Sequence, residues 1–180
     1  MTSKELKVNT DRIGVLIGKG GSTKREIEEK TGTAIKVDSR EGVVTVEGES
    51  PEGVLSAANL IEAINRGFSP ERAFMLFKEE GMILDVIDLS PLADTPQKLE
   101  RIRGRIIGRD GRSREQIEEM TETSISIFGK TVAIIGLFEQ VKLARTAVEM
   151  LINGAPHETV YSFLDRRRRE ARQDLVKHYY

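Results

Sequence analysis

The stretch Gly104–Ile127, GRIIGRDGRSREQIEEMTETSISI, has a close copy ninety residues earlier, where Gly14–Val37 reads GVLIGKGGSTKREIEEKTGTAIKV. Ten of the 24 aligned positions are identical, and the alignment needs no gap. Solenoid repeats have periods of about 20 to 50 residues, so a period near 90 is too long for one. The chain is therefore predicted to contain one domain twice.

Composition restricts the chemistry of the chain, which has 180 residues, 28 Lys and Arg against 29 Asp and Glu, two histidines and no cysteine. The net charge of −1 alone argues against a broadly basic polyanion binder. The lack of cysteine excludes disulfides, thiolate zinc sites and cysteine nucleophiles. We predict no catalytic residue, no metal site and no cofactor.

The near-neutral total conceals two basic segments. Residues 11–25 carry four basic side chains and one acid, and residues 101–114 carry six arginines and one acid. Seven of the chain's 16 glycines lie in the same two segments. Glycine lets the backbone approach a ligand closely, so glycine combined with positive charge is typical of an anion-binding loop.

Both copies predict the same order of elements: strand, helix, glycine loop, helix, strand, strand and helix. In the first copy these are residues 6–8, 12–17, 22–31, 34–38, 43–47 and 51–66, with Ser22 or Thr23 as cap of the second helix. In the second they include 82–88, 113–121, 124–128, 131–135 and 138–152, with a helix opening near 94–97. Helices are also predicted at 69–78 and 158–177.

A helix, then Gly-x-x-Gly, then a second helix resembles the signature of the KH domain, and the element order resembles its type I form. The two loops read Ile17-Gly18-Lys19-Gly20-Gly21 and Ile107-Gly108-Arg109-Asp110-Gly111. The resemblance implies an α+β fold of two β-α-α-β-β-α units, each a three-stranded antiparallel sheet backed by three helices, plus a C-terminal helix. We place the first KH domain at 1–67, a connecting helix at 68–80, the second KH domain at 81–154 and a C-terminal basic helix at 155–180.

Such a loop presses its backbone against a sugar-phosphate chain, and the following helix points its N-terminus at the same anion. Ile17 and Ile107 would line a shallow groove that admits only unpaired bases, so single-stranded RNA is the expected ligand. The predicted RNA-binding residues are Arg12, Ile17, Gly18, Lys19, Gly20, Gly21, Ser22, Lys24, Arg25, Arg103, Arg105, Ile107, Gly108, Arg109, Asp110, Gly111, Arg112, Ser113 and Arg114.

Two positions depart from the usual KH pattern. Lys24 and Arg114 stand where an apolar residue is common, which suggests one basic contact per copy. Asp110 places a carboxylate inside the second loop, where it repels phosphate. Either nearby arginines compensate for it or the second loop binds less tightly.

Other interpretations were weighed for the same residues. The Gly14–Gly20 segment is a residue short for a P-loop and lacks its Ser or Thr, and Thr23 breaks a dinucleotide fingerprint. The Glu28-Glu29 and Glu118-Glu119 pairs are interpreted as solvent-facing or loop-supporting rather than catalytic. For Arg166–Arg169, a solvated helix face and a contact with RNA or protein remain equally open.

The tandem arrangement, the segment around Gly108 and the tail NGAPHETVYSFL are similar to the Partner of Nob-one family of small-subunit assembly factors, in its archaeal form. The resemblance implies a non-catalytic, cytoplasmic, monomeric protein that binds the 3′ region of small-subunit precursor rRNA. Its implied partners are the nuclease Nob-one, the rRNA dimethyltransferase or a translation-initiation factor subunit, with no membrane. The alternatives are an mRNA or single-stranded DNA regulator and a protein-docking scaffold.

Overall fold

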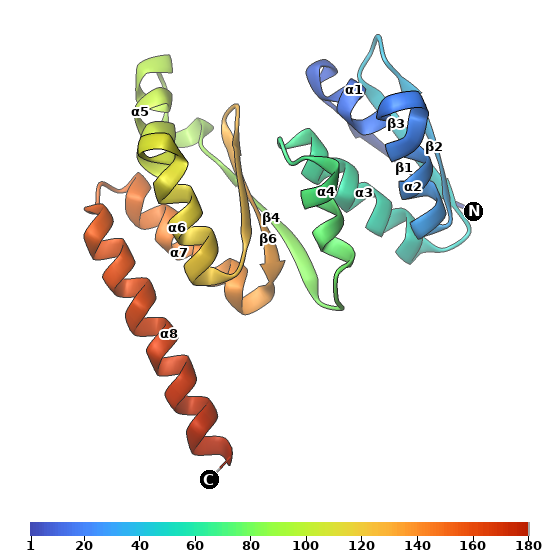
Figure 1. Cartoon of the computed structure of the whole chain (residues 1–180). Helices are drawn as coiled ribbons and strands as arrows, with labels where there is room; N and C mark the ends of the chain where they lie inside the picture. Colours follow the sequence, from blue (N-terminus) through green and yellow to red (C-terminus); the bar gives the residue numbers. More distant parts are fainter. Residues whose placement is uncertain (180) are drawn as a thin grey trace. The chain divides into compact units, whose positions relative to one another are not determined.

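The computed structural model describes residues 1–179 and divides the chain into two compact units, Met1–Glu80 and a second that begins at Gly81 (Figure 1). Tyr180, the last residue of the predicted C-terminal helix, lies outside the described residues. Each unit holds a three-stranded antiparallel sheet and three helices in the order β-α-α-β-β-α. This confirms the predicted α+β fold of two KH domains with a C-terminal helix.

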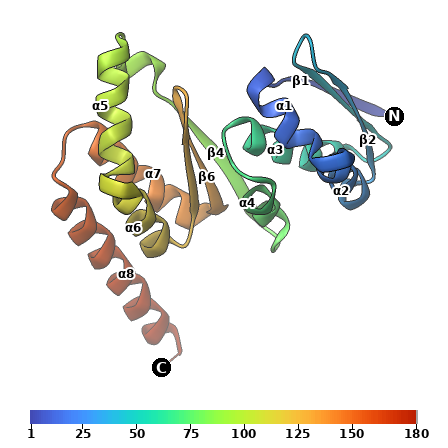
Figure 2. The same cartoon turned by 45° about the horizontal axis from the view of Figure 1, so that its top comes forward.

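The first unit builds its sheet in the order β1-β3-β2, so the last strand in sequence is central. Thr2 pairs with Gly48 at one end of the β1–β3 ladder and Lys7 with Val43 at the other. Figures 1 and 2 show the helices of this unit against the sheet. Its elements are β1 Thr2–Lys7, α1 Thr10–Ile17, α2 Ser22–Thr31, β2 Thr33–Asp38, β3 Val43–Gly48 and α3 Pro51–Asn65, followed by α4 Pro70–Ala73 and a 3₁₀ turn at Phe74–Phe77.

The second unit repeats this topology with the strand order β4-β6-β5. Its last helix, α8, has no counterpart in the first unit (Figure 2). The elements are β4 Met82–Asp88, α5 Pro96–Ile107, α6 Arg112–Thr121, β5 Ser124–Phe128, β6 Thr131–Leu137, α7 Phe138–Ile152 and α8 His157–Tyr179.

Short polar side chains and prolines explain where several helices begin. Ser50, Ser69 and Thr95 each accept a hydrogen bond from a backbone N–H of the first turn, and a proline follows each of them. Proline is suited to the first helical position because its missing N–H would have no partner there. The caps explain why the boundaries of α3 and α5 can be predicted from sequence.

Apolar side chains from the helices and the inner sheet face form a separate core in each unit. In the first, Leu16 from α1, Ile27 from α2, Val46 from β3 and Ile64 from α3 are fully buried. The second core has the same plan and adds Val160 and Leu164 from α8. Burying one such side chain contributes about 1.5–3 kcal/mol, so these contacts hold α1 and α2, or α5 and α6, in place around the glycine loop.

Three local expectations differ from the structure. The first strand begins at Thr2 rather than Leu6, because pairing with β3 and not apolar content defines this polar edge strand. The helix predicted at 69–78 is one turn of α-helix followed by a 3₁₀ turn. Gly21, not Ser22 or Thr23, caps α2. Among residues 1–179, no helix is both long enough and apolar enough to span a bilayer.

Candidate nucleic-acid interface

The two glycine loops have the same backbone geometry. Gly18 ends α1 at φ 74°, ψ 175°, and Gly108 ends α5 at φ 74°, ψ 178°. In both, the N–H of this glycine bonds to the carbonyl four residues earlier, at 3.0 Å in the first loop and 2.9 Å in the second. Because unrelated neighbours surround the two loops, the shared conformation follows from the repeated Gly-x-x-Gly.

The first glycine of each loop is required by space as well as by backbone angle. A Cβ on Gly18 would lie 2.8 Å from the Cβ of Thr23, and a Cβ on Gly108 would lie 2.8 Å from the backbone N of Ser113. Positive φ with ψ near 180° is accessible essentially to glycine alone. This residue therefore allows the chain to turn tightly from one helix into the next.

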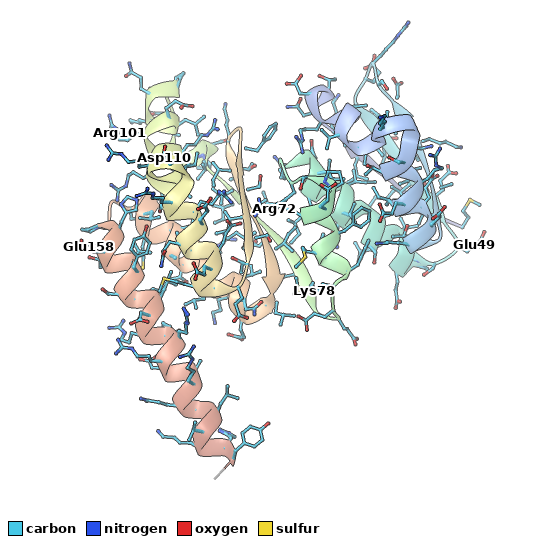
Figure 3. The ribbon with its side chains drawn as sticks, viewed as in Figure 1. Glu49, Arg72, Lys78, Arg101, Asp110 and Glu158 are labelled. Atoms are coloured by element: carbon cyan, nitrogen blue, oxygen red, sulfur yellow. The ribbon has the colours of Figure 1, made fainter. Side chains whose placement is uncertain are left out.

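The third loop position differs between the copies. Gly20 has φ 61° and Asp110 has φ 54°, so both residues are left-handed. A Cβ on Gly20 would meet nothing within 4 Å, which explains how an aspartate fits in the second copy. Asp110 is exposed at the turn between α5 and α6, where its carboxylate adds negative charge to a predicted phosphate site (Figure 3).

The helix that follows each loop begins without a side-chain cap. Gly21 caps α2 and Gly111 caps α6, both at left-handed φ, and neither offers a side-chain acceptor to the first turn. The unbonded N–H groups of a helix N-terminus and its dipole together attract anions. The geometry at both loops thus fits a phosphate group.

Several predicted cations surround these helix ends. Lys19 and Arg109 follow the first glycine of each loop and are exposed, as are Arg25 and Arg112. Ser22 is exposed too, while Ile17 and Ile107 are half-buried at the ends of α1 and α5. The structure therefore places exposed charge and partly exposed apolar surface beside each loop.

The two residues that depart from the KH pattern form ion pairs within their own helices. Lys24 Nζ lies 3.9 Å from Glu28, and Arg114 Nη1 donates to Glu118 Oε1 at 2.5 Å. The second oxygen of each glutamate accepts the backbone N–H of Ile35 at 2.9 Å or of Ile125 at 2.8 Å. The glutamates therefore tie α2 to β2 and α6 to β5, a role that the sequence analysis did not identify.

Two predicted RNA contacts have structural roles instead. Arg12 donates to the carbonyls of Ile64 at 2.9 Å and Phe68 at 2.8 Å. Arg105 donates in the same way to Leu151 at 3.0 Å and Ala155 at 2.5 Å. Each guanidinium thus bonds carbonyls at and just beyond the end of α3 or α7, and partial burial lowers the pKa of Arg12.

Two further predicted contacts are largely removed from solvent. Ser113 is 3% exposed and its hydroxyl has no hydrogen-bond partner, since it lies beneath Gly108. The Nε of Arg103 is also buried and unpaired, although its Nη1 lies 3.5 Å from Glu100. Burial of this kind depends on helix packing and leaves no signal in a charge count.

Family models match both units. A model described as a KH domain matches residues 3–63, and one described as a eukaryotic type KH-domain (KH-domain type I) matches residues 83–169. A KH domain-containing protein of Methanocaldococcus jannaschii is 42% identical over 172 residues, which cover 93% of this chain and 75% of that protein.

Two further matches carry more specific names. The pre-rRNA-processing protein PNO1 of Chaetomium thermophilum is 32% identical over 72% of this chain, which spans about half of that longer protein (49%). The crystal structure of an a/eIF2alpha-aDim2p-rRNA complex from Pyrococcus horikoshii contains a chain 48% identical to this one. It aligns with a TM-score of 0.87 over 94% of this chain and 95% of that one.

Proposed function

Since the chain belongs to the tandem KH-domain family that includes PNO1 and Dim2, we propose that it is a non-catalytic RNA-binding protein of small-subunit ribosome maturation. Its ligand is a single-stranded segment near the 3′ end of the small-subunit rRNA. The observation that carries the proposal is the presence of two Gly-x-x-Gly loops of one geometry, each opening an uncapped helix beside exposed cations.

The loops favour RNA with unpaired bases for a steric reason. A backbone that passes over the Gly-x-x-Gly turn places its bases toward the helix ends that carry Ile17 and Ile107. A duplex hides its base edges and cannot offer them to a shallow apolar surface. Binding energy therefore comes from phosphates at the loops, and base contacts set the register of the strand.

The test is fluorescence anisotropy with a short single-stranded RNA from the rRNA 3′ end and the double variant Gly20→Asp, Arg109→Asp. Because Asp110 already occupies the equivalent left-handed position, Gly20→Asp is compatible with the fold. The variant should bind at least tenfold more weakly, since each lost phosphate contact reduces the salt slope by about 0.7.

The matched control is Lys78→Asp combined with Gln97→Glu, two exposed positions outside the loops that change the net charge by the same amount. The control should retain most of its affinity. Equal loss in both proteins would attribute binding to overall charge and would contradict the loop proposal. Competition with DNA of the same sequence separates an rRNA ligand from a general single-stranded DNA binder.

A second function is suggested by the complex of the similar Pyrococcus protein with a/eIF2alpha and rRNA. We propose that this chain also docks an initiation-factor subunit, and that the nuclease Nob-one and the rRNA dimethyltransferase are further candidate partners. The protein would act as a cytoplasmic monomer. Copurification of a partner that survives ribonuclease treatment supports docking, and loss after ribonuclease shows that RNA alone joined the two.

A further inference from the structure

The last helix, α8, extends beyond the helices that hold it. Its first half is anchored by Val160 and Leu164, which are fully buried against α6 and α7. His157 Nε2 also lies 2.7 Å from the carbonyl oxygen of Arg105. From Asp165 to Tyr179 every residue except Arg168 is exposed, and Figure 1 shows this half running past α6 and α7.

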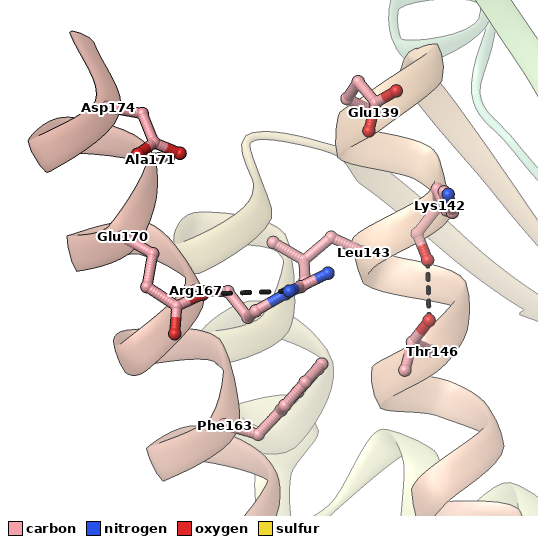
Figure 4. A pocket seen from close by; sticks show the side chains of 9 residues that line it. All are labelled: Glu139, Lys142, Leu143, Thr146, Phe163, Arg167, Glu170, Ala171 and Asp174. Carbon is pink, nitrogen blue, oxygen red and sulfur yellow. Dashed lines mark hydrogen bonds and ion pairs between the residues drawn. The ribbon is translucent and has the colours of Figure 1, made fainter. Parts of the chain in front are cut away.

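This exposed half separates its charges by face. Glu170 and Asp174 line the pocket between α7 and α8, together with Arg167 and Phe163 (Figure 4). Arg166, Arg169 and Arg172 are not part of that wall. With about 100° per residue, they and Lys177 project from the opposite side of the helix. We call these four residues the α8 basic face.

The cations of the α8 basic face are largely uncommitted. Among the described residues, no carboxylate lies within ion-pair distance of Arg166 or Arg172. Arg169 lies 3.4 Å from Asp165, but both side chains are more than half exposed, and such pairs are weak. The face therefore presents nearly its full positive charge to a partner.

We propose that the α8 basic face is a second RNA-binding element, which contacts the phosphodiester backbone of double-helical RNA adjoining the single-stranded segment at the loops. From Arg166 to Lys177 the helix rises about 16 Å, enough to follow several phosphates along one strand. The proposal rests on the proposed function only in taking RNA as the ligand.

The composition of this face favours a duplex over a second single strand. Its other exposed members, Gln173 and Val176, provide no aromatic surface on which a base could stack. Recognition of single strands uses such stacking, whereas a duplex presents an outer surface of phosphates. A face built of cations alone therefore matches phosphates and leaves sequence selection to the loops.

The experiment compares two RNAs by anisotropy across a salt series. One is an unstructured single strand, and the other is the same strand extended by a hairpin of about one helical turn. The α8 variant replaces Arg166, Arg169 and Arg172 with Gln. The control replaces Lys4, Lys36 and Lys78 with Gln, which removes the same charge from exposed sites in the first unit.

The wild-type protein and the control should bind the hairpin RNA more tightly than the single strand. The α8 variant should lose this gain, at least tenfold at about 0.1 M salt, with a salt slope shallower by about 2 to 3. Its affinity for the unextended strand should be unchanged. Circular dichroism checks that α8 remains helical.

Equal binding of the hairpin RNA by the α8 variant and the control would overturn the proposal and leave the face free for a protein partner. The loop variant Gly20→Asp, Arg109→Asp separates this failure from failure of the proposed function. If that variant still binds the single strand, the loop mode is wrong whatever α8 does. If it loses the single strand while α8 substitutions change nothing, only the α8 proposal fails.

Discussion

Single residues of the two loops fall into those fixed by geometry and those free to vary. Gly18 and Gly108 combine positive φ, extended ψ and a close neighbour, so no side chain fits. Gly20 has positive φ but open space around it, and the second copy has an aspartate at that position. The Gly-x-x-Gly pattern thus contains positions of unequal cost.

We therefore predict that Gly108→Ala destabilises the second unit by about 3 kcal/mol or more, because left-handed strain adds to a clash with Ser113. Gly20→Ala should cost only about 1–2 kcal/mol, the penalty of left-handed backbone alone. Urea unfolding of both variants measures the difference. Similar losses would contradict the distinction drawn from the added Cβ contacts.

Asp110→Gly should improve the second loop in two respects. Glycine removes the strain of a side chain at φ 54°, which stabilises the unit by up to about 1 kcal/mol. It also removes a carboxylate from the phosphate site, so affinity for single-stranded RNA should rise several-fold at low salt. Asp94→Gly, an exposed site outside the loop, tests whether charge alone explains a gain. Unchanged affinity would mean that the loop does not contact phosphate.

At the scale of elements, side chains rather than the loops fix the helices around each site. Glu28 and Glu118 join the helix after the loop to the neighbouring strand, and Arg12 and Arg105 join the helix before it to the end of the third helix. Arg12 and Arg105 do not align in the repeat, since residue 12 corresponds to 102. The two copies have thus reached one kind of contact from positions one helical turn apart.

Arg105→Lys tests this contact. A single ammonium cannot reproduce the two-carbonyl geometry of the guanidinium, so the second unit should lose about 1–3 kcal/mol of stability. Arg101→Lys is the matched control, because Arg101 is exposed and outside this contact. Thermal unfolding monitored by circular dichroism measures both. RNA affinity of the folded Arg105→Lys protein should stay within about twofold of wild type, since surface charge is kept.

At the scale of the whole molecule, charge is distributed rather than absent. The net charge is −1, yet residues 11–25 and 101–114 are basic, so the rest of the chain carries a surplus of acid. Acid elsewhere disfavours nonspecific attachment of RNA, while the loops provide local attraction. The near-neutral total is therefore compatible with a nucleic-acid ligand confined to two places.

Two sites on one chain lead us to expect avidity. A single-stranded RNA that carries two binding segments joined by a flexible spacer should bind about 10²-fold more tightly than either segment alone. Arg109→Asp or Lys19→Asp alone should each reduce this RNA to the affinity of one segment. Isothermal titration calorimetry gives both affinity and stoichiometry. An affinity independent of the second segment would show that only one loop binds.

Much of the fold could be predicted because it depends on local signals. Apolar periodicity and the caps at Ser50 and Thr95 mark the helices, and β4, β5 and α7 have the predicted ends. Edge strand β1 was predicted too short because its polar residues carry little apolar signal, and its extent follows from pairing with β3. The predicted contacts of the loop residues with RNA stay predictions.

The sequence by itself determined the duplication, the two Gly-x-x-Gly loops and their positive charge, since these are properties of residue order. Only the tertiary structure decided which cations are available to a ligand. Arg12 and Arg105 bond carbonyls, Lys24 and Arg114 pair with glutamates, and Lys19 and Arg109 stay exposed. The reason is physical: a guanidinium or ammonium binds whichever acceptor packing brings within about 3 Å, and that acceptor can lie fifty residues away.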